Sequence, residues 1–340
     1  MTRPEITANR FDSSRSEEWD EFVRLRSRNG GLFHERRFLS YHQEGRFRDV
    51  SLVFRDATHR LVGVLPCAEV DLDDGRCGVE SHPGSSAGSF VFARDARTSH
   101  VLAIVDAAVG HFRDEGFARF GLRQPEAIFA ASTSGELEFA LWHRGFRLRT
   151  RELSTAIRLG DDGARLALAR AKAAVDERAA RRRGVEIRES ADVEAVWGIV
   201  AENLKQRYRK APAHSAAELG ALKRLYPDRI RFWCATRDTA TLAAIVIFEV
   251  TPRAAHTFYI AHDRTMADVN PMPLLVSEIC ADLAARGFDW LNFGISTRGD
   301  LIKWGILEFK EFMGGRGVCR EEWQLADLGG FQPYEWNAKA

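Results

Sequence analysis

Hydrophobic and polar positions along this chain repeat one order of strand-like and helix-like patterns. Runs rich in Val, Leu and Ile predict two consecutive strands in each half, at DVSLVFRD (49–56) and HRLVGVLPCAEV (59–70), and at IRFWCATRD (230–238) and LAAIVIFEV (242–250). Each pair precedes a long segment with helical periodicity, at 96–117 and 270–288, and then another strand, at 117–122 and 289–295. The pattern predicts an α/β protein with two similar halves.

A Gly-Phe pair joins the helical segment to the next strand in both halves. The two pairs begin at Gly116 and Gly287, which are 171 residues apart. A nearly constant offset between matching elements predicts a duplicated domain. The alternative is that the match arises by chance, because a glycine is a common end for any helix.

Each half then continues with a short helix and a further strand. These segments are 134–146 and 147–159 in the first half, and 301–315 and 317–325 in the second. An Ala- and Arg-rich helical segment, 164–190, lies between the halves. We therefore expect an N-terminal domain at 1–160, a linker helix at 161–190 and a C-terminal domain at 191–340, with a substrate cleft between the domains.

Composition narrows the class of protein. The chain has 340 residues, 45% of them hydrophobic and 29% charged, which is typical of a globular protein with two domains. The formal charge of +1 shows no global basic excess for binding nucleic acid, although a local patch remains compatible with it. The cysteines lack CxxC spacing and predict free thiols and no metal site (Cys67, Cys77, Cys234, Cys280 and Cys319). The first residues lack the apolar core of a signal peptide, and no run is long enough to span a membrane, so we expect a cytoplasmic protein.

The predicted order of elements is that of the GNAT acyltransferase fold, and two such units in one chain resemble the FemAB-like aminoacyltransferases. The motifs that carry the resemblance are ESHPGSSAGSF (80–90), the segment 202–230, HTFYIAHD (256–263), LNFGIST (291–297) and ILEFKEFMGGRGV (306–318). The resemblance covers nearly the whole chain. It implies an acyltransferase with an α/β fold of two tandem GNAT-like domains, whose mixed β-sheets are flanked by helices. The N-terminal domain would hold the acceptor and the C-terminal domain the acyl donor.

One turn in the sequence indicates which acyl donor the protein uses. In the GNAT fold the sheet opens between two parallel strands, and we place this opening between the strands at 256–263 and 290–296. Members that use acyl-CoA bind its pyrophosphate with a glycine-rich turn at the start of the next helix. The corresponding turn here, AHDRTMADVNPMP (261–273), has no glycine. FemAB-like ligases use aminoacyl-tRNA instead, so the resemblance implies aminoacyl-tRNA as co-substrate and no other cofactor.

Two basic segments are candidates for contact with RNA. The candidate residues are Lys205, Arg207 and Arg209 in LKQRYRK, and Arg181, Arg182 and Arg183 at the end of the linker helix. Solvated helix faces explain both segments as well, because positive residues near a helix C-terminus complement its dipole.

Lys310 lies in the most specific motif, between Phe309 and Phe312. The resemblance implies that this lysine acts near the phosphates or the charge that develops during transfer, and that Phe309 contacts substrate. The alternative is a surface lysine whose stem packs over Phe309. Asn292 and Ser296 alternate on one face of the preceding strand and complete the predicted catalytic set.

Further residues are candidates for binding substrate. Tyr259 lies on the neighbouring strand, where core packing is the alternative, and His262 ends that strand beside Asp263. The motif departs from its relatives at 297–300, because the loop is short and Arg298 stands where relatives carry an acid; we expect Arg298 to contact substrate.

The loop after Glu80 is the predicted acceptor site. His82, Gly84, Ser85 and Ser86 offer an imidazole, backbone amides and hydroxyls to a polar acceptor, although an ordinary tight turn explains the same residues. Either His82 or His262 could move a proton near neutral pH.

The resemblance, together with these residues, implies an aminoacyltransferase that moves an amino acid from aminoacyl-tRNA to an amine of a small molecule or peptide. One alternative is N-acylation of an amino sugar or similar amine by an acyl-CoA. Another is a non-catalytic protein that binds RNA or a partner. Neither the acceptor nor the oligomeric state follows from the sequence.

Overall fold

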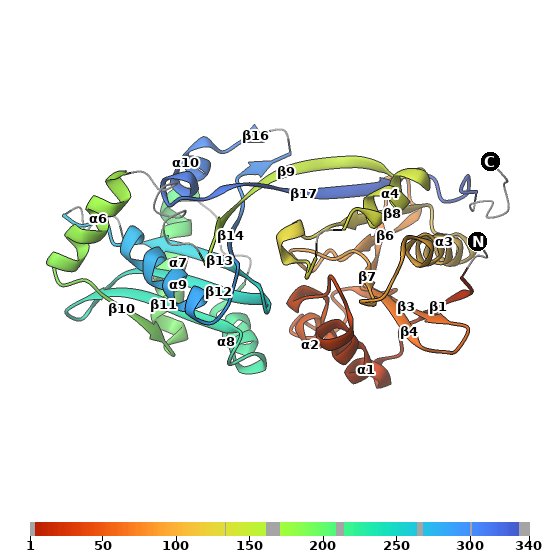
Figure 1. Ribbon diagram of the computed structural model, residues 1–340, viewed down its shortest axis with the longest axis horizontal. Coiled ribbons are helices and arrows are strands. Elements are labelled where there is room, and N and C mark those ends of the chain that lie inside the picture. The colour runs from red at the N-terminus through yellow and green to blue at the C-terminus, as the bar shows by residue number, and fades with distance from the viewer. Residues whose placement is uncertain are drawn as a thin grey trace. The chain divides into compact units, whose positions relative to one another are not determined.

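The computed structural model describes residues 4–132, 134–160, 171–208, 214–263, 268–299 and 301–332. The chain forms two compact units (Figure 1). Unit 1 comprises Met1–Arg151 and Cys319–Ala340, and unit 2 comprises Glu152–Val318. The units interleave in sequence and so differ from the consecutive domains expected at 1–160 and 191–340. The reason is that the last strand of the chain pairs within unit 1.

Unit 1 contains most of the short elements. Its strands are β1 (Ile6–Arg10), β2 (Arg48–Asp49), β3 (Leu52–Asp56), β4 (Leu61–Leu65), β5 (Ala68–Asp71), β6 (Cys77–Ser81), β7 (Val91–Phe92), β8 (Arg119–Arg123), the start of β9 (Arg147–Arg158) and the end of β17 (Arg316–Leu325). Its helices are α1 (Ser16–Glu21), α2 (Arg36–Leu39), α3 (Thr98–Asp114) and α4 (Glu136–His143), with a π-helical turn at Phe22–Arg26 and 3₁₀ turns at Ser13–Arg15, Leu32–His34 and Ala127–Phe129.

The strands of unit 1 form two sheets. The smaller has the order β1-β3-β4-β7, and the strands of the larger that lie in this unit have the order β9-β17-β8-β6-β5-β2. From β17 to β2, β6 and β8 are parallel and the other neighbours are antiparallel, as are all neighbours in the smaller sheet. Residues 322–325 of β17 pair with β8, which is why the end of the chain belongs to this unit.

The run at 59–70 was expected to be one strand, and that prediction is wrong. It forms β4 and β5, which belong to different sheets. Pro66 lies between them, and proline has no N–H to donate to a neighbouring strand, so the ladder breaks there. The run at 49–56 also divides, between β2 and β3, where Val50 N–H donates to Cys67 O at 3.0 Å.

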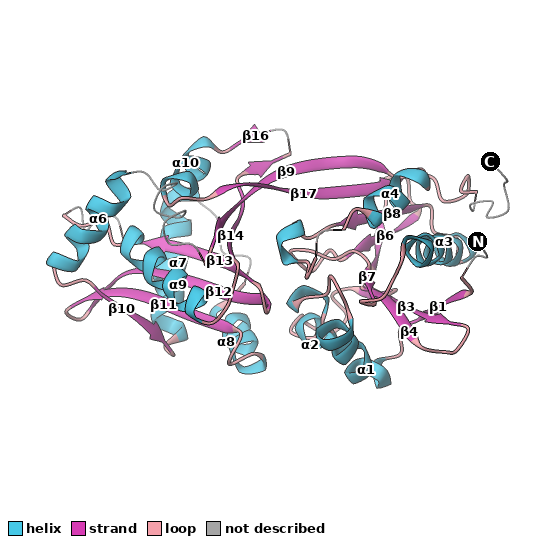
Figure 2. Ribbon diagram, in the orientation of Figure 1, coloured by secondary structure: helices cyan, strands magenta, loops and turns pink. Residues whose placement is uncertain are grey.

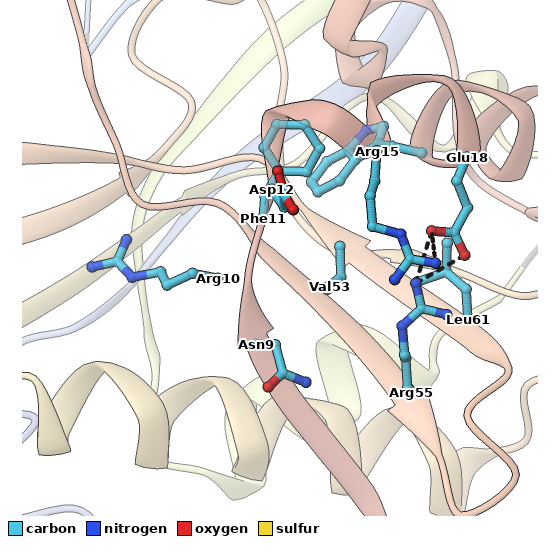
Figure 3. A pocket seen from close by; sticks show the side chains of 10 residues that line it. Asn9, Arg10, Phe11, Asp12, Arg15, Glu18, Val53, Arg55 and Leu61 are labelled. Carbon is cyan, nitrogen blue, oxygen red and sulfur yellow. Dashed lines mark hydrogen bonds and ion pairs between the residues drawn. The ribbon is translucent and has the colours of Figure 1, made fainter.

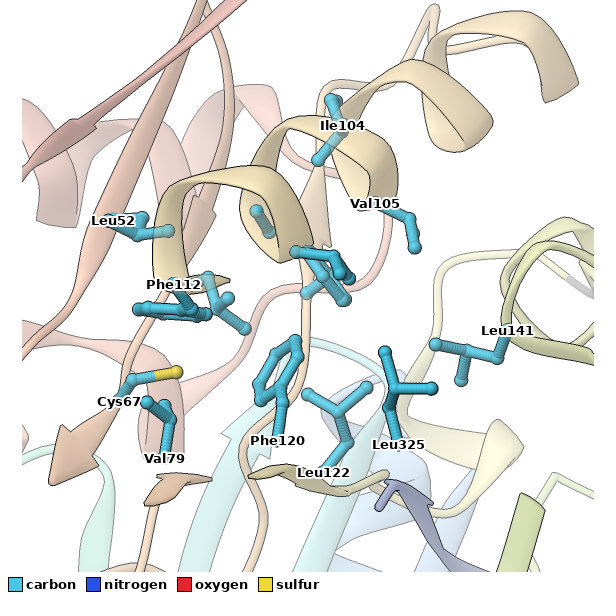
Figure 4. Close-up of a cluster of buried hydrophobic side chains, with 14 of the residues drawn as sticks. Leu52, Cys67, Val79, Ile104, Val105, Phe112, Phe120, Leu122, Leu141 and Leu325 are labelled. Carbon is cyan, nitrogen blue, oxygen red and sulfur yellow. The ribbon is translucent and has the colours of Figure 1, made fainter. Parts of the chain in front are cut away.

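The core of unit 1 surrounds α3. Its buried side chains include Ile104, Val105 and Phe112, which pack with Leu52 of β3 and Phe120 of β8 (Figure 4). The helix therefore contacts residues of both sheets. Phe112 is fully buried, and truncation of such a side chain to alanine costs about 3–5 kcal/mol.

Unit 2 contains the remaining elements. Its strands are the end of β9, β10 (Glu186–Ser190), β11 (Ile230–Arg237), β12 (Ala240–Thr251), β13 (Ala254–His262), β14 (Trp290–Ile295), β15 (Thr297–Arg298), β16 (Leu301–Ile302) and the start of β17. Its helices are α6 (Ala171–Arg182), α7 (Val193–Tyr208), α8 (Ala216–Leu225), α9 (Met272–Ala285) and α10 (Trp304–Phe312).

The main sheet of unit 2 has the order β10-β11-β12-β13-β14-β9, and only β13 and β14 are parallel neighbours. Helix α9 packs on one face, where Ile279 and Leu283 belong to the same buried hydrophobic cluster as Ile245 and Ile247 of β12. Helix α7 also packs on β12 and β13. Figure 2 shows helices beside strands in both units, and this mixed α/β architecture confirms the predicted fold class.

The two long helical segments are confirmed as α3 and α9. Gly116 and Gly287 follow them with φ of 85° and 84°, the left-handed conformation in which glycine ends a helix. The structure describes the expected linker helix only from Ala171 onward, as α6, and residues 161–170 lie outside the described residues. Among the described residues, every helix is too short or too polar to cross a bilayer.

Candidate active site

The sheet of unit 2 opens between its two parallel strands. β13 and β14 pair at Ala254 with Trp290, at Ala255 with Leu291 and at His256 with Asn292. Beyond this point β13 stays paired with β12 as far as His262, and β14 reaches Ile295 opposite Ser154 of β9. Among the described residues the parallel ladder ends at His256 and Asn292, so β13 and β14 no longer pair with each other beyond that point. The end of this ladder lies between the two segments where the sequence predicts the opening.

Asn292 holds the opening in shape. Its side chain is fully buried, and Oδ1 accepts the N–H of Gly294 at 2.5 Å. His256 Nδ1 lies 2.9 Å from the same oxygen, and Asn292 Nδ2 donates to Ser154 Oγ at 3.2 Å. The register of β14 with β9 shifts between Asn292 and Ile295, so the network fixes a bulge.

Gly294 is required at this bulge for two reasons. Its φ is 72°, a backbone conformation that residues other than glycine rarely adopt. A Cβ here would also lie 3.1 Å from Cε1 of His256. The imidazole therefore packs directly against the backbone of the bulge.

Lys310 is buried at the opening, with 3% of its surface exposed. Its Nζ donates to Gly294 O at 2.6 Å and to Ile295 O at 2.7 Å. The alternative of a surface lysine is therefore wrong. Phe309 and Phe312 pack against the hydrophobic core, which turns Lys310 of α10 toward the strand and explains why a lysine stands between two phenylalanines. Contact of Phe309 with substrate stays a prediction.

Ser296 follows the bulge and is fully buried. Its N–H donates to Leu153 O at 2.7 Å, and its carbonyl accepts the N–H of Lys303 at 2.9 Å. Its Oγ has no hydrogen-bond partner among the residues that the structure describes. A buried hydroxyl without a partner costs free energy, so Ser296 is suited to bind a substrate atom.

The other residues predicted in this half lie farther along the strands or on the surface. Tyr259 is half-buried, and its hydroxyl lies 2.8 Å from His214 Nδ1. The carbonyl of His262 accepts Asn203 Nδ2 at 3.0 Å. Arg298 is exposed in the β15–β16 hairpin. Their roles in binding substrate stay predictions.

Unit 1 is closed where unit 2 is open. Its parallel strands β6 and β8 pair through Ser81 and Leu122, and the pairing continues when Gly88 N–H donates to Arg123 O at 2.9 Å. The chain after His82 thus fills the position of the opening. His34 fixes this arrangement, because its Nε2 lies 2.7 Å from Gly88 O.

The predicted acceptor residues form one tight loop. Gly84 N–H donates to His82 Nδ1 at 3.1 Å, Ser85 is buried, and Ser86 O accepts Arg320 Nη1 at 3.3 Å. A Cβ on Gly84 would lie 2.4 Å from Phe47, so the packing requires glycine. The structure brings the four residues together, and acceptor binding stays a prediction.

His82 is not suited to accept a proton at neutral pH. Burial lowers the pKa of its imidazole to about 4. The backbone N–H of Gly84 donates to Nδ1, so the neutral ring carries its proton on Nε2. The idea that His82 moves a proton near neutral pH is therefore wrong, and the ring is a hydrogen-bond donor.

The basic residues that are candidates for RNA contact differ in whether their charge is paired with an acidic side chain. Arg181 pairs with Glu177 at 3.3 Å and with Glu278 at 2.5 Å, which favours a structural role for that arginine. The neighbouring Arg182 and Arg183, and Lys205 of α7, are exposed. Arg207 lies in α7 and Arg209 lies outside the described residues, so RNA contact stays a prediction for these residues.

In two other polar sites, the charged side chains already form ion pairs with neighbouring residues. A pocket of about 200 Å³ in unit 1 contains Arg15 and Arg55, which both pair with Glu18, at 2.9 and 2.8 Å (Figure 3). A separate cluster of Glu69, Asp71 and Cys77 has ligand atoms close enough to share an ion, but Arg48 already pairs with both carboxylates. Neither site is built like a catalytic centre.

His256, Gly294 and Ser154 were not predicted as site residues. His256 lies within the quoted motif HTFYIAHD, and Gly294 lies two positions after Asn292. The spacing Asn-x-Gly at the end of a strand is the signal that indicates a bulge. Nothing local marks Ser154, which lies 138 residues from Asn292 in sequence.

Comparison with known proteins agrees with this geometry. Residues 164–311 match the model of the acetyltransferase (GNAT) domain. The structure of FemX is similar over 95% of this chain and 97% of that chain, with a TM-score of 0.72 and 12% identity. L-PGS from Bacillus licheniformis is similar over 94% and 93%, with a TM-score of 0.59 and 11% identity.

A tandem GNAT protein from the clavulanic acid biosynthesis pathway is similar over 97% of this chain and all of that chain, with a TM-score of 0.52 and 14% identity. No curated protein sequence matches this chain. These findings confirm the predicted fold of tandem GNAT-like domains for the whole chain, and they identify residues 164–311 as matching a GNAT domain.

Proposed function

We propose that this protein is an aminoacyltransferase that takes an amino acid from aminoacyl-tRNA and forms an amide bond on an amine of a small molecule or peptide. The observation that carries the proposal is the buried ammonium of Lys310 at the bulge of the opened sheet. The fold shared with FemX and with L-PGS supports the acyl transfer chemistry.

The start of α9 supports an ester donor over a coenzyme A thioester. In GNAT enzymes that use acyl-CoA, the pyrophosphate lies on bare amides at this helix N-terminus. Here Pro271 precedes the helix and Pro273 lies in its first turn, so two N–H donors are lost. Pro271–Val276 are also buried, which leaves the helix N-terminus poorly exposed to a phosphate group.

The chemistry follows from the site. The amine nitrogen attacks the ester carbonyl, and the carbonyl π electrons move onto oxygen. The ammonium of Lys310, fixed by two carbonyls, can stabilise an oxyanion that develops beside it without reorganising. Collapse of the intermediate forms the amide and releases the 3′-hydroxyl of the tRNA. Because charged tRNA is made in the cytoplasm, the proposal places the enzyme there.

One further candidate has an observation in its favour. Transfer from an acyl-CoA to an amino sugar or similar amine is supported by the match to the acetyltransferase (GNAT) domain. The tandem GNAT protein was solved without AcCoA, and the mention of AcCoA links that protein to an acyl-CoA donor.

The experiment is a comparison of donors. The protein is incubated with pools of charged tRNA and, separately, with acyl-CoAs, in the presence of candidate amines, and the loss of ester or thioester is followed. The proposal expects ester loss that depends on the amine and is abolished by prior RNase treatment. Thioester loss with tight, stoichiometric binding of acetyl-CoA by calorimetry would replace it with the second candidate.

A further inference from the structure

His256 lies at the point where β13 and β14 separate. It is the last residue of β13 paired with β14, and it is half-buried. Its ring contacts the two features that define the site, because Nδ1 meets Asn292 and Cε1 faces the backbone of Gly294. Gly294 is also the residue whose carbonyl binds Lys310.

The hydrogen bonds at this point determine which nitrogen of His256 carries the proton. Asn292 Oδ1 accepts the backbone N–H of Gly294, and only an oxygen can accept there. The same oxygen can only accept from His256, so Nδ1 must be the donor. The neutral ring consequently has its lone pair on Nε2, which lies 3.9 Å from the position that a Cβ of Gly294 would take.

We propose that His256 is the general base of the acyl transfer, an inference that rests on the proposed function. In this step the amine nitrogen forms its bond to the carbonyl carbon and loses a proton to Nε2 of His256. When the intermediate collapses, the C–O bond to the leaving alcohol breaks and the alkoxide takes a proton from the imidazolium. Atoms and charge balance as amine plus ester giving amide plus alcohol, with His256 neutral before and after.

The surroundings suit a proton carrier. Asn292 orients the ring through Nδ1, as an orienting group does for histidine bases in general. Among the described residues, Lys310 from α10 bonds to the carbonyl of Gly294, and the rings of His214 and Tyr259 contact Phe258, which the ring of His256 also contacts. Lys310 and His256 thus both adjoin Gly294, and the proposal assigns the first to the oxyanion and the second to the amine proton.

Two matched substitutions separate the base from its structural role. His256→Asn places an amide nitrogen near the position of Nδ1, so it can still donate to Asn292, and it removes Nε2. His256→Gln places its amide nearer Nε2 and loses the bond to Asn292. His59→Asn is the control, because His59 is exposed with φ of 62°, a conformation that asparagine adopts readily.

Single-turnover rates with saturating donor are measured from acid to neutral pH. We expect the wild type and His59→Asn to lose rate at low pH as the imidazole is protonated. We expect His256→Asn to fold normally, to be about 10²–10⁴-fold slower, and to lose that acidic limb. A rate and pH profile in His256→Asn equal to those of the wild type would overturn the proposal.

A second measurement does not need a substrate. Nitrogen chemical shifts of ¹⁵N-labelled protein above neutral pH, assigned by comparison with His256→Gln, report the tautomer of His256. We expect protonated Nδ1 and unprotonated Nε2. The opposite tautomer would overturn the base assignment even if transfer is observed, whereas absence of transfer by the wild type from every ester donor would instead overturn the proposed function.

Discussion

Replacement of Asn292 by alanine is expected to release the bulge that shapes the site. The side chain bonds with three partners: Gly294 N–H at 2.5 Å, His256 Nδ1 at 2.9 Å, and Ser154 Oγ, to which Nδ2 donates at 3.2 Å and from which Oδ1 accepts at 3.4 Å. Each such bond contributes about 1 kcal/mol net, so their loss costs about 3 kcal/mol. Because this network is local, the cost should appear first as easier opening of β14.

Hydrogen exchange measures this opening without assuming that the two units unfold together. About 3 kcal/mol corresponds to ~10²-fold faster amide exchange in the peptide that contains Gly294. Peptides from β6 and β8 in unit 1 serve as the internal control and should not change. Ser154→Ala removes only the two longest of these contacts, both made by Ser154 Oγ, and should accelerate exchange about tenfold or less.

Exchange in the Gly294 peptide that stays within about twofold of the wild type would refute the reasoning. Such a result would mean that Asn292 does not hold the bulge and that its burial reflects packing alone. Equal acceleration in both units would also contradict it, because the loss would then be global.

Three further predictions concern stability and binding. The pKa of histidine is near 6.5 in the unfolded chain and about 4 for folded His82, so this residue contributes about 3 kcal/mol of stability above pH 6.5 that is lost as the pH falls toward 4. His82→Asn can still accept from Gly84 N–H, and its free energy of unfolding should fall less than that of the wild type between pH 7 and pH 4.5; an equal fall would contradict the burial argument. Thr155→Val replaces a hydroxyl that is buried without a partner among the described residues, and it should raise the free energy of unfolding by about 1 kcal/mol; clear destabilisation in a melt would count against this. Arg298→Ala should raise KM more than it lowers kcat, because Arg298 is exposed in a hairpin; a pure kcat effect in steady-state kinetics would place it at the chemical step instead.

Much of the fold follows from local patterns. The periodicity at 96–117 and 270–288 predicts α3 and α9 because their apolar positions face one side, and a glycine in the left-handed conformation ends each helix. The break at Pro66 could have been predicted from the missing N–H, but the hydrophobic run on both sides masks it. The interleaving of the units could not, because it depends on which strand β17 pairs with.

The site was predictable only in part. Asn292 and Lys310 lie in two successive motifs, 291–297 and 306–318, and the predicted opening places them together. His256 and Ser154 act through contacts with Asn292 that span 36 and 138 residues of sequence, and no local pattern indicates such contacts. The tautomer of His82 also depends on a turn geometry that residue types alone do not determine.

The most direct test of the central claim is the rate of the chemical step in Lys310→Met, measured in single turnovers with saturating donor and acceptor. Methionine keeps the unbranched stem but loses the two bonds to Gly294 O and Ile295 O, so folding of the variant is verified first by hydrogen exchange. Lys303→Met is the control, because Lys303 is exposed at the start of the same helix. We predict a rate about 10²-fold or more below the wild type for Lys310→Met, and a rate within about twofold of the wild type for Lys303→Met. Equal rates in folded Lys310→Met and wild-type protein would contradict the assignment of the acyl-transfer centre to the opened sheet of unit 2.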